Sequence, residues 1–244
     1  MLVLILLFSA ALLGGLSAIY LPGKEGLNYK LALVFSGAYL FAITVTHILP
    51  DLYSNPSASG FTGLMVLGGF VLQQILEFIS QGVEHGHVHV HKTGKAHQAA
   101  TAFVVLGSLS IHALLEGTML TSISEENNNT SGPMFWGILM HKMPEAFALM
   151  SVLICELSKR KAIRILFLFA LASPIGLWMS SSMYFRGILT PQVIQGLFAV
   201  VCGSFLHIST TIVFESSSGH SFNAKKSMVA LAGFATALLA DFLF

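Results

Sequence analysis

Residues 132–157 read GPMFWGILMHKMPEAFALMSVLICEL, a predominantly apolar run with His141, Lys142 and Glu145 close to its middle. The run exceeds the roughly 20 residues that an α-helix needs to cross about 30 Å of hydrocarbon. Comparable apolar runs lie on either side of it, at 1–21, 31–53, 60–83, 99–123, 162–185, 192–214 and 226–244. The sequence therefore predicts an all-α membrane protein with eight transmembrane helices.

The overall composition favours a membrane protein without a soluble domain. Hydrophobic residues make up 55% of the 244 residues and charged residues 9%, and the mean hydropathy is +0.78, whereas soluble domains carry roughly 25% charged residues. We expect one transmembrane domain over residues 1–244, embedded in a lipid bilayer. The net charge of +1 gives no indication of a nucleic-acid partner. Because the run at 1–21 lacks a preceding basic region, we interpret it as a spanning helix and not as a signal peptide.

Basic residues fall almost entirely in alternate connecting segments. Arg186 alone lies in the opposite set, and Lys142 lies inside an apolar run. Cytoplasmic segments are the ones enriched in Lys and Arg, so both termini are expected to be non-cytoplasmic. The short connections favour a bacterial inner (plasma) membrane as the location. The basic residues on the predicted cytoplasmic side are Lys24, Lys30, Lys92, Lys95, Lys159, Arg160, Lys161, Arg164, Lys225 and Lys226.

Two consecutive apolar runs each contain a histidine and a glutamate four positions apart. They are His112 and Glu116 in the run 99–123, and His141 and Glu145 in the run 132–157. Residues four apart share one face of a helix, and ionisable residues at membrane depth usually mark a functional site. A single pair could be a hydrogen bond within the core, but two pairs on neighbouring antiparallel helices can converge on one tetrahedral Zn²⁺ ion.

A proline lies between the two ionisable positions of the second run. Pro144 removes the hydrogen bond to the carbonyl of Met140. Irregular backbone at membrane depth is tolerated where it lines a cavity or is buried in protein, so the proline is consistent with an ion pathway, although ordinary kinks are also common in membrane helices.

Five motifs resemble those of the ZIP (Zrt/Irt-like) metal transporters. They are His112-Ala-Leu-Leu-Glu116-Gly117, His141-Lys-Met-Pro-Glu145-Ala146, His47-Ile-Leu-Pro50-Asp51, Ser173-Pro174-Ile175-Gly176 and Gly203-Ser204-Phe205-Leu206. The resemblance implies a divalent metal transporter and not an enzyme, with the metal site between the helices at 99–123 and 132–157. It also implies uptake towards the cytoplasm, a homodimer, an inverted repeat of the first three and last three helices around the central two, and elevator-like movement.

Two positions depart from the pattern of family members that build a two-metal centre. Those members place an amide or carboxylate directly after the metal ligands, where this chain has Ala113 and Lys142. An ammonium group can replace a second cation and offset the charge of nearby carboxylates. We therefore expect one metal ion at a time; alternatively, Lys142 extends to the membrane surface. The predicted ligands of this single ion are His112, Glu116, His141 and Glu145.

Further ionisable residues predict a pathway and a metal-capturing loop. His47 and Asp51 form a candidate access site at the non-cytoplasmic end, with a hydrogen-bonded helix end as the alternative reading. In the run 192–214 and just beyond it, His207 and Glu215 are pathway candidates, whereas Glu77 is expected to be a structural partner or an interfacial group. Alternating histidines in the predicted cytoplasmic loop at about 84–98 favour transient metal capture; they are His85, His87, His89, His91 and His97.

Zinc is the expected substrate, because two imidazoles and two carboxylates suit this borderline cation, although Fe²⁺, Mn²⁺ and Cd²⁺ are also open. The main rival is an intramembrane zinc hydrolase, which would hold Zn²⁺ on three histidines and activate water. A cation-diffusion exporter would carry a soluble C-terminal domain, which we do not expect here, and a non-transporting metal receptor is not separated from a transporter by any sequence feature.

Overall fold

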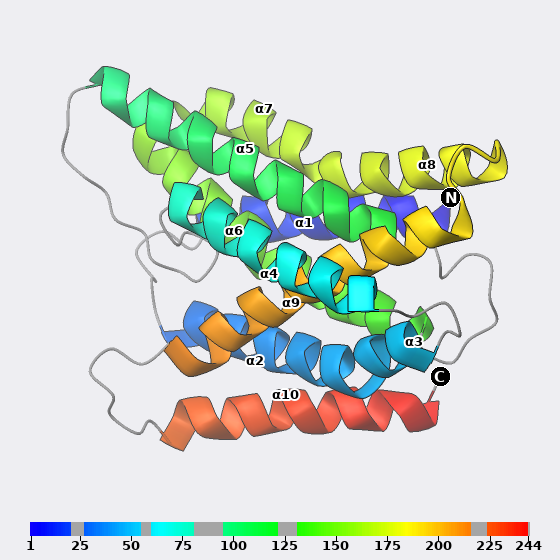
Figure 1. Ribbon diagram of the computed structural model, residues 1–244. Helices are drawn as coiled ribbons and strands as arrows, with labels where there is room; N and C mark the ends of the chain where they lie inside the picture. Colours follow the sequence, from blue (N-terminus) through cyan, green and yellow to red (C-terminus); the bar gives the residue numbers. More distant parts are fainter. Residues whose placement is uncertain (21–26, 55–59, 81–94, 122–130, 216–223, 244) are drawn as a thin grey trace.

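The computed structural model describes residues 1–244 apart from 21–26, 55–59, 81–94, 122–130, 216–223 and 244. Helices are the only regular elements of the described part, and Figure 1 shows their arrangement. In chain order they are α1 (Leu2–Tyr20), α2 (Leu27–Ile43), η1 (Thr44–Ile48), α3 (Leu49–Ser54), α4 (Gly60–Ser80), α5 (Lys95–Met119), α6 (Ser131–Glu156), α7 (Lys159–Ala170), α8 (Ala172–Phe185), α9 (Pro191–Glu215) and α10 (Ala224–Leu243).

The prediction of an all-α membrane protein is confirmed. Among the described residues, seven helical segments are long and apolar enough to cross a membrane, with α2, η1 and α3 forming one of them and α7 and α8 another. Each corresponds to one of the apolar runs of the sequence. The helix α10 is not among the seven, so the eighth crossing stays a prediction.

The second segment contains a π-helical turn at Thr44–Ile48. The backbone N–H of Leu49 donates to the carbonyl of Thr44, five residues earlier. Pro50 has no N–H and cannot bond to the carbonyl four residues before it, so this stretch cannot keep the regular α-helical ladder. The wider turn carries His47, one of the candidate pathway residues.

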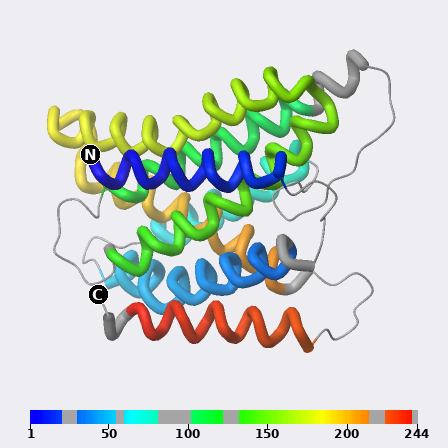
Figure 2. Tube along the Cα trace, turned by 180° about the vertical axis from the view of Figure 1, so that it is seen from behind, coloured from blue at the N-terminus to red at the C-terminus, as the bar shows by residue number. Residues whose placement is uncertain are grey.

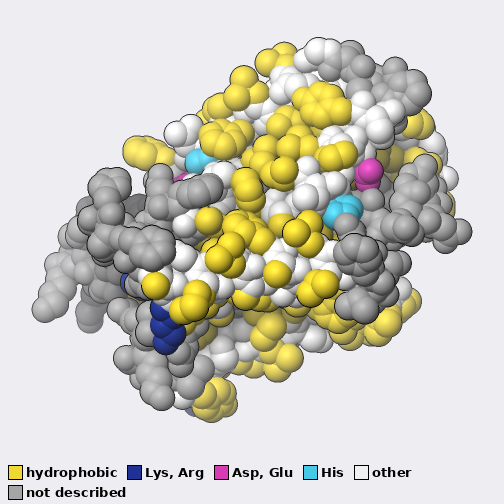
Figure 3. Space-filling view, turned by 90° about the horizontal axis from the view of Figure 1, so that it is seen from below, with side chains coloured by type: hydrophobic (Ala, Val, Ile, Leu, Met, Phe, Trp, Pro, Cys, Tyr) yellow, Lys and Arg dark blue, Asp and Glu magenta, His cyan; other side chains and the backbone are white. Residues whose placement is uncertain are grey.

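The outer surface is largely apolar, as expected for helices that contact lipid. Figure 3 shows hydrophobic side chains spread over one face with few charged ones between them. On α4 the exposed side chains include those of Phe61, Leu64, Leu67, Ile75 and Phe78. Large apolar side chains rarely gather in water on this scale, so these side chains fit the predicted bilayer environment.

The helices form two bundles that are each held together by close backbone contacts. The first bundle consists of α1, α5, α6, α7 and α8, and the second of α2, α4, α9 and α10 (Figures 1 and 2). In the first, a Cβ on Gly117 of α5 would overlap the Ser173 carbonyl of α8; in the second, a Cβ on Gly203 of α9 would overlap the Val66 carbonyl of α4. Small residues allow this close approach in membrane helix pairs.

Side-chain hydrogen bonds join the two bundles. The Tyr39 hydroxyl of α2 donates to the Pro133 carbonyl of α6 (3.1 Å), and the Ser108 hydroxyl of α5 donates to the Leu76 carbonyl of α4 (2.7 Å). These hydrogen bonds join α2 to α6 and α5 to α4, two helix pairs that are also in contact across the boundary between the bundles.

The helix pairings also fit the predicted inverted repeat. The most extensive contacts are made by α1 with α6, α5 with α8, α4 with α9, and α2 with α10. In chain order the first three predicted transmembrane helices are α1, α2 and α4, the fourth and fifth are α5 and α6, and the last three are α8 (with α7), α9 and α10. The inverted repeat exchanges α1 with α8, α2 with α9, α4 with α10, and α5 with α6. This exchange converts the pair α1–α6 into α8–α5 and the pair α4–α9 into α10–α2. The contact pattern is thus unchanged by the exchange.

Candidate metal site

His112 and Glu116 of α5 meet His141 of α6 inside the protein. One ligand atom from each of these residues lies within 4.8 Å of the others, the only such group of three found among the described residues. Their side chains are at most 1% exposed. The two imidazole rings are 6.1 Å apart between centroids and nearly perpendicular, at 89°. Two imidazoles and a carboxylate that face one point form a donor set typical of zinc.

Close helix packing fixes the positions of α5 and α6 at this point. On α5, Gly117 directly follows Glu116 and lies against the Ser173 carbonyl of α8. On α6, the Met143 carbonyl, two residues after His141, lies against Gly14 of α1. Neither glycine leaves room for a Cβ, so the ligand-bearing turns are anchored to their neighbours through backbone contacts.

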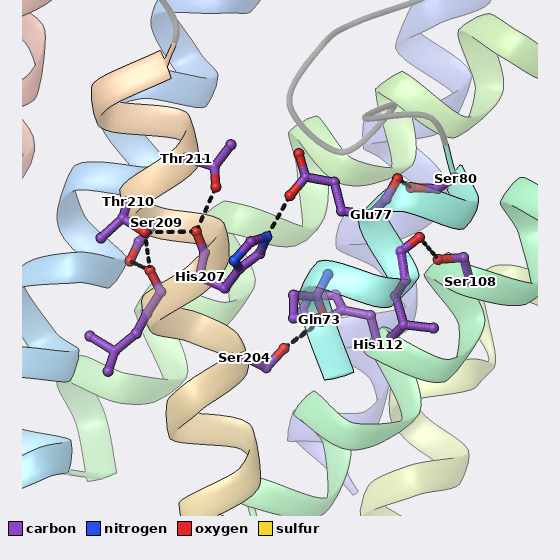
Figure 4. Close-up of polar contacts among 12 residues, drawn as sticks. Gln73, Glu77, Ser80, Ser108, His112, Ser204, His207, Ser209, Thr210 and Thr211 are labelled. Atoms are coloured by element: carbon purple, nitrogen blue, oxygen red, sulfur yellow. Dashed lines mark hydrogen bonds and ion pairs between the residues drawn. The ribbon is translucent and has the colours of Figure 1, made fainter. Parts of the chain in front are cut away.

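A hydrogen-bonded chain from the second bundle orients the ring of His112 (Figure 4). The Ser204 hydroxyl of α9 donates to Oε1 of Gln73 on α4 (2.7 Å), and the same hydroxyl oxygen lies 3.4 Å from Nδ1 of His112. In the tautomer with its proton on Nδ1, the ring donates to this hydroxyl oxygen, whose own proton is directed to Gln73. In that tautomer the lone pair of Nε2 is available to a metal ion, an arrangement typical of histidine ligands.

The spacing on the other side of the ring fits a shared ion. Nε2 of His112 lies 3.1 Å from Oε1 of Glu116. Two ligand atoms that each lie about 2.0–2.1 Å from one tetrahedral zinc ion are separated by roughly this distance. The pair is therefore already spaced for coordination.

Lys142 is buried between the two glutamates. Its side chain is 2% exposed, its ammonium pairs with Oε2 of Glu116 and lies 2.6 Å from Oε2 of Glu145, and the Phe169 ring lies 5.6 Å from the nitrogen. The alternative in which this lysine extends to the membrane surface is not observed. The ammonium instead lies where a second cation would contact both carboxylates.

Glu145 keeps one oxygen unused. Its Oε1 is buried and makes no hydrogen bond, whereas Oε2 is held by Lys142. The carboxylate does not belong to the group of three ligand atoms described above, so its role as a fourth ligand stays a prediction. Ala113, which is fully buried, offers no donor at the other position where two-metal members have one. Pro144 lies inside α6, which continues as a single helix to Glu156.

A second histidine–carboxylate pair links α4 and α9. Nε2 of His207 lies 2.5 Å from Oε2 of Glu77, and the edge of the His207 ring meets Phe70 at 4.8 Å between centroids. The pair lies one helical turn beyond Gln73 and Ser204 (Figure 4). His207 thus adjoins the residues that contact His112, and its carboxylate partner is Glu77.

The remaining predicted residues are placed as follows. His47 is half-buried in η1, with Nδ1 2.6 Å from the Thr46 hydroxyl, and Asp51 is exposed in α3. His85, His87, His89 and His91 lie outside the described residues, and the side chains of His97 and Glu215 are not described either. The loop and the access site remain predictions.

Gln73 and Ser204 were not predicted from the sequence. Gln73 is a buried amide in an apolar run, four residues before Glu77. This spacing places both side chains on one face of α4. It is the sequence feature from which Gln73 could have been predicted as part of the site. Ser204 belongs to a motif used for the family resemblance, but its contact with a metal-ligand candidate depends on how α9 crosses α5.

Comparison with known proteins identifies the family of the chain. A family described as "ZIP Zinc transporter" matches residues 81–241. Protein zntD of Dictyostelium discoideum is 27% identical over 63% of this chain and 24% of its own length, and zinc transporter ZIP9-B of Xenopus laevis is 28% identical over 74% of this chain and 61% of its own length. The chain thus matches about a quarter to three fifths of the length of these relatives. With two thirds of its residues matched, the chain belongs to the ZIP zinc transporter family.

Proposed function

We propose that the protein carries Zn²⁺ across a membrane through the site formed by His112, Glu116 and His141. The observation that carries this proposal is the burial of two imidazoles and a carboxylate at one point between α5 and α6. Burying ionisable groups at membrane depth is costly, and such groups usually mark a functional site where they occur. Family membership supports transport, and the relative ZIP9-B is named a zinc transporter.

The site holds one ion at a time. Glu116 and Glu145 each direct one oxygen to the Lys142 ammonium, so the position between them is already taken by a positive charge. Oε1 of Glu145, which makes no hydrogen bond, is the fourth ligand after a small rotation of its side chain. Two imidazoles favour zinc over Mn²⁺ and Fe²⁺, and Cd²⁺ is accepted as a mimic.

Transport runs towards the cytoplasm. The distribution of Lys and Arg favours a cytoplasmic position for the segment after α4, and Glu77 and His207 lie towards that end of α4 and α9. His47 and Asp51 lie near the opposite end of the second helical segment. The ion would therefore pass His47 first and His207 last, with both termini on the non-cytoplasmic side.

Movement of the first bundle against the second opens the site to each side in turn. The ligands His112, Glu116 and His141 all belong to the first bundle, whereas Ser204, Gln73, Glu77 and His207 belong to the second. The ion would thus travel with one rigid group of helices past polar groups of the other. The exposed apolar face of α4 is available to lipid or to a second copy in the predicted homodimer.

Zinc uptake into proteoliposomes tests this function. The wild type should accumulate zinc, Glu145→Ala should lose this uptake, and removal of residues 85–91 should spare it. A wild type that retains one zinc ion without moving any would instead favour the intramembrane hydrolase. Glu156→Ala, at the end of the same helix, is the matched control and should transport like the wild type.

A further inference from the structure

We infer that Lys142 sets the affinity of the central site low enough for the ion to leave, by acting as a fixed positive charge shared by both glutamates. This inference rests on the proposed function and adds a specific role in ion release. It is independent of which face of the membrane the ion reaches.

The geometry leaves one side of each carboxylate to the lysine and the other to the metal. Glu116 has Oε1 beside Nε2 of His112 and Oε2 on the Lys142 ammonium. Glu145 has Oε2 on the ammonium and an Oε1 that makes no hydrogen bond. An ion bound at the free oxygens therefore does not need to displace the lysine, and both cations contact the same two carboxylates.

With Lys142 in the site, the net charge is equal in size and opposite in sign before and after the ion binds. With Lys142 ionised, the two glutamates and the lysine carry a net charge of minus one when empty and plus one when a divalent ion is bound. Without the lysine, the same site would carry minus two when empty and zero when loaded. In a buried environment the loaded, neutral site would be strongly favoured over the empty one.

The neighbours of Lys142 keep its charged group inside the protein. Its side chain is 2% exposed, and the nearby Phe169 ring at 5.6 Å favours the cation without neutralising it. The ammonium is thus held in the site in the absence of metal. It repels a bound ion across the two shared carboxylates, and this repulsion promotes release.

Lys142→Met tests the inference because methionine is of similar length and carries no charge. In purified protein titrated with zinc alone, we expect the dissociation constant to fall by at least about tenfold, with one ion still bound. In proteoliposomes, KM for zinc should fall and the maximal rate should also fall, because release is slowed. Lys142→Arg, which keeps the charge, should lower the dissociation constant far less than Lys142→Met does.

Lys142→Asp sharpens the test by offering an oxygen ligand in place of the ammonium. This variant should bind two zinc ions per chain, as measured by metal analysis after gel filtration. If a variant does not fold without metal, it can be purified with zinc, and the rate of release into a chelator should then be slower than in the wild type.

The outcomes separate this inference from the proposed function. Transport by the wild type combined with unchanged or weaker zinc binding in Lys142→Met would overturn the role of the lysine and leave the transport function intact. Absence of transport by the wild type, together with tighter zinc binding in Lys142→Met, would overturn the transport function and retain the electrostatic role.

Discussion

Two histidine–glutamate contacts among the described residues, His112 with Glu116 and His207 with Glu77, combine the same residue types in different surroundings. His112 and Glu116 lie on one helix, are at most 1% exposed, and are flanked by Lys142. His207 and Glu77 come from two helices, and their side chains are 9% and 21% exposed. A buried pair can replace the hydration shell of an ion, whereas a partly exposed pair can exchange an ion with water. From this difference we expect the first pair to bind the ion and the second pair to be passed by it.

The largest effect is expected from Glu116→Gln, which removes the carboxylate of the deep pair. Changes to groups that only support a metal ligand already weaken binding by roughly 10–100-fold, so loss of the ligand itself should exceed about hundredfold. Competition with a chromophoric chelator measures this affinity. Glu77→Gln is the matched control, the same change at the second pair, and it should leave tight binding intact; equal losses in both variants would remove the distinction between the pairs.

The close contact between α4 and α9, the helices that carry the second pair, is the next test. Gly69→Val inserts a side chain against the Val200 carbonyl of α9, where even a Cβ does not fit, so α4 and α9 must separate. We expect a loss of stability of about 1–3 kcal/mol, seen as a lower melting temperature in detergent. Gly68→Val is the control, because no atom lies within 4 Å of a Cβ placed at Gly68. Similar melting temperatures for the two variants would contradict the close α4–α9 contact.

A smaller effect is expected from His207→Ala on transport. On the proposed route the ion passes the His207–Glu77 pair and is held at the deep site, so zinc uptake should fall by a few-fold, on the order of 1 kcal/mol. The zinc affinity of purified protein should be unchanged. A loss of tight binding would show instead that His207 belongs to the central site.

The smallest effect is expected from replacing His85, His87, His89 and His91 with serine. Metal capture after transport adds nothing to the transport step itself, so the initial rate of zinc uptake should stay within about twofold of the wild type. Initial rates in proteoliposomes measure this directly. A collapse of uptake would place these histidines on the required route.

The sequence predicted the elements whose signal is local. Each apolar run became a helical segment, because only helices satisfy the backbone of a chain in lipid, and the four-residue spacing of His112 and Glu116 placed both on one helix face. Proximity of His141 to this pair also followed from the adjacency of consecutive helices. These features depend on periodicity and length, which a single sequence contains.

Other features depend on how distant helices cross and could not be predicted in this way. The contact of Ser204 with His112 requires α9 to cross α5 at one particular height, and the pairing of His207 with Glu77 requires the glycine contacts between α4 and α9. The π-helical turn at Thr44–Ile48 was also missed, although Pro50 was visible, because a proline can be accommodated in several ways. The buried position of Lys142 was one of two alternatives until its partners were located.

X-ray absorption at the zinc edge tests the proposed site most directly, using purified protein loaded with one equivalent of zinc. We expect a spectrum with nitrogen and oxygen ligands only, two of them imidazoles, and a reduction to one imidazole in His141→Ala. Sulfur ligands, three imidazoles, or a spectrum that does not change in His141→Ala would contradict a zinc ion held by His112, Glu116 and His141.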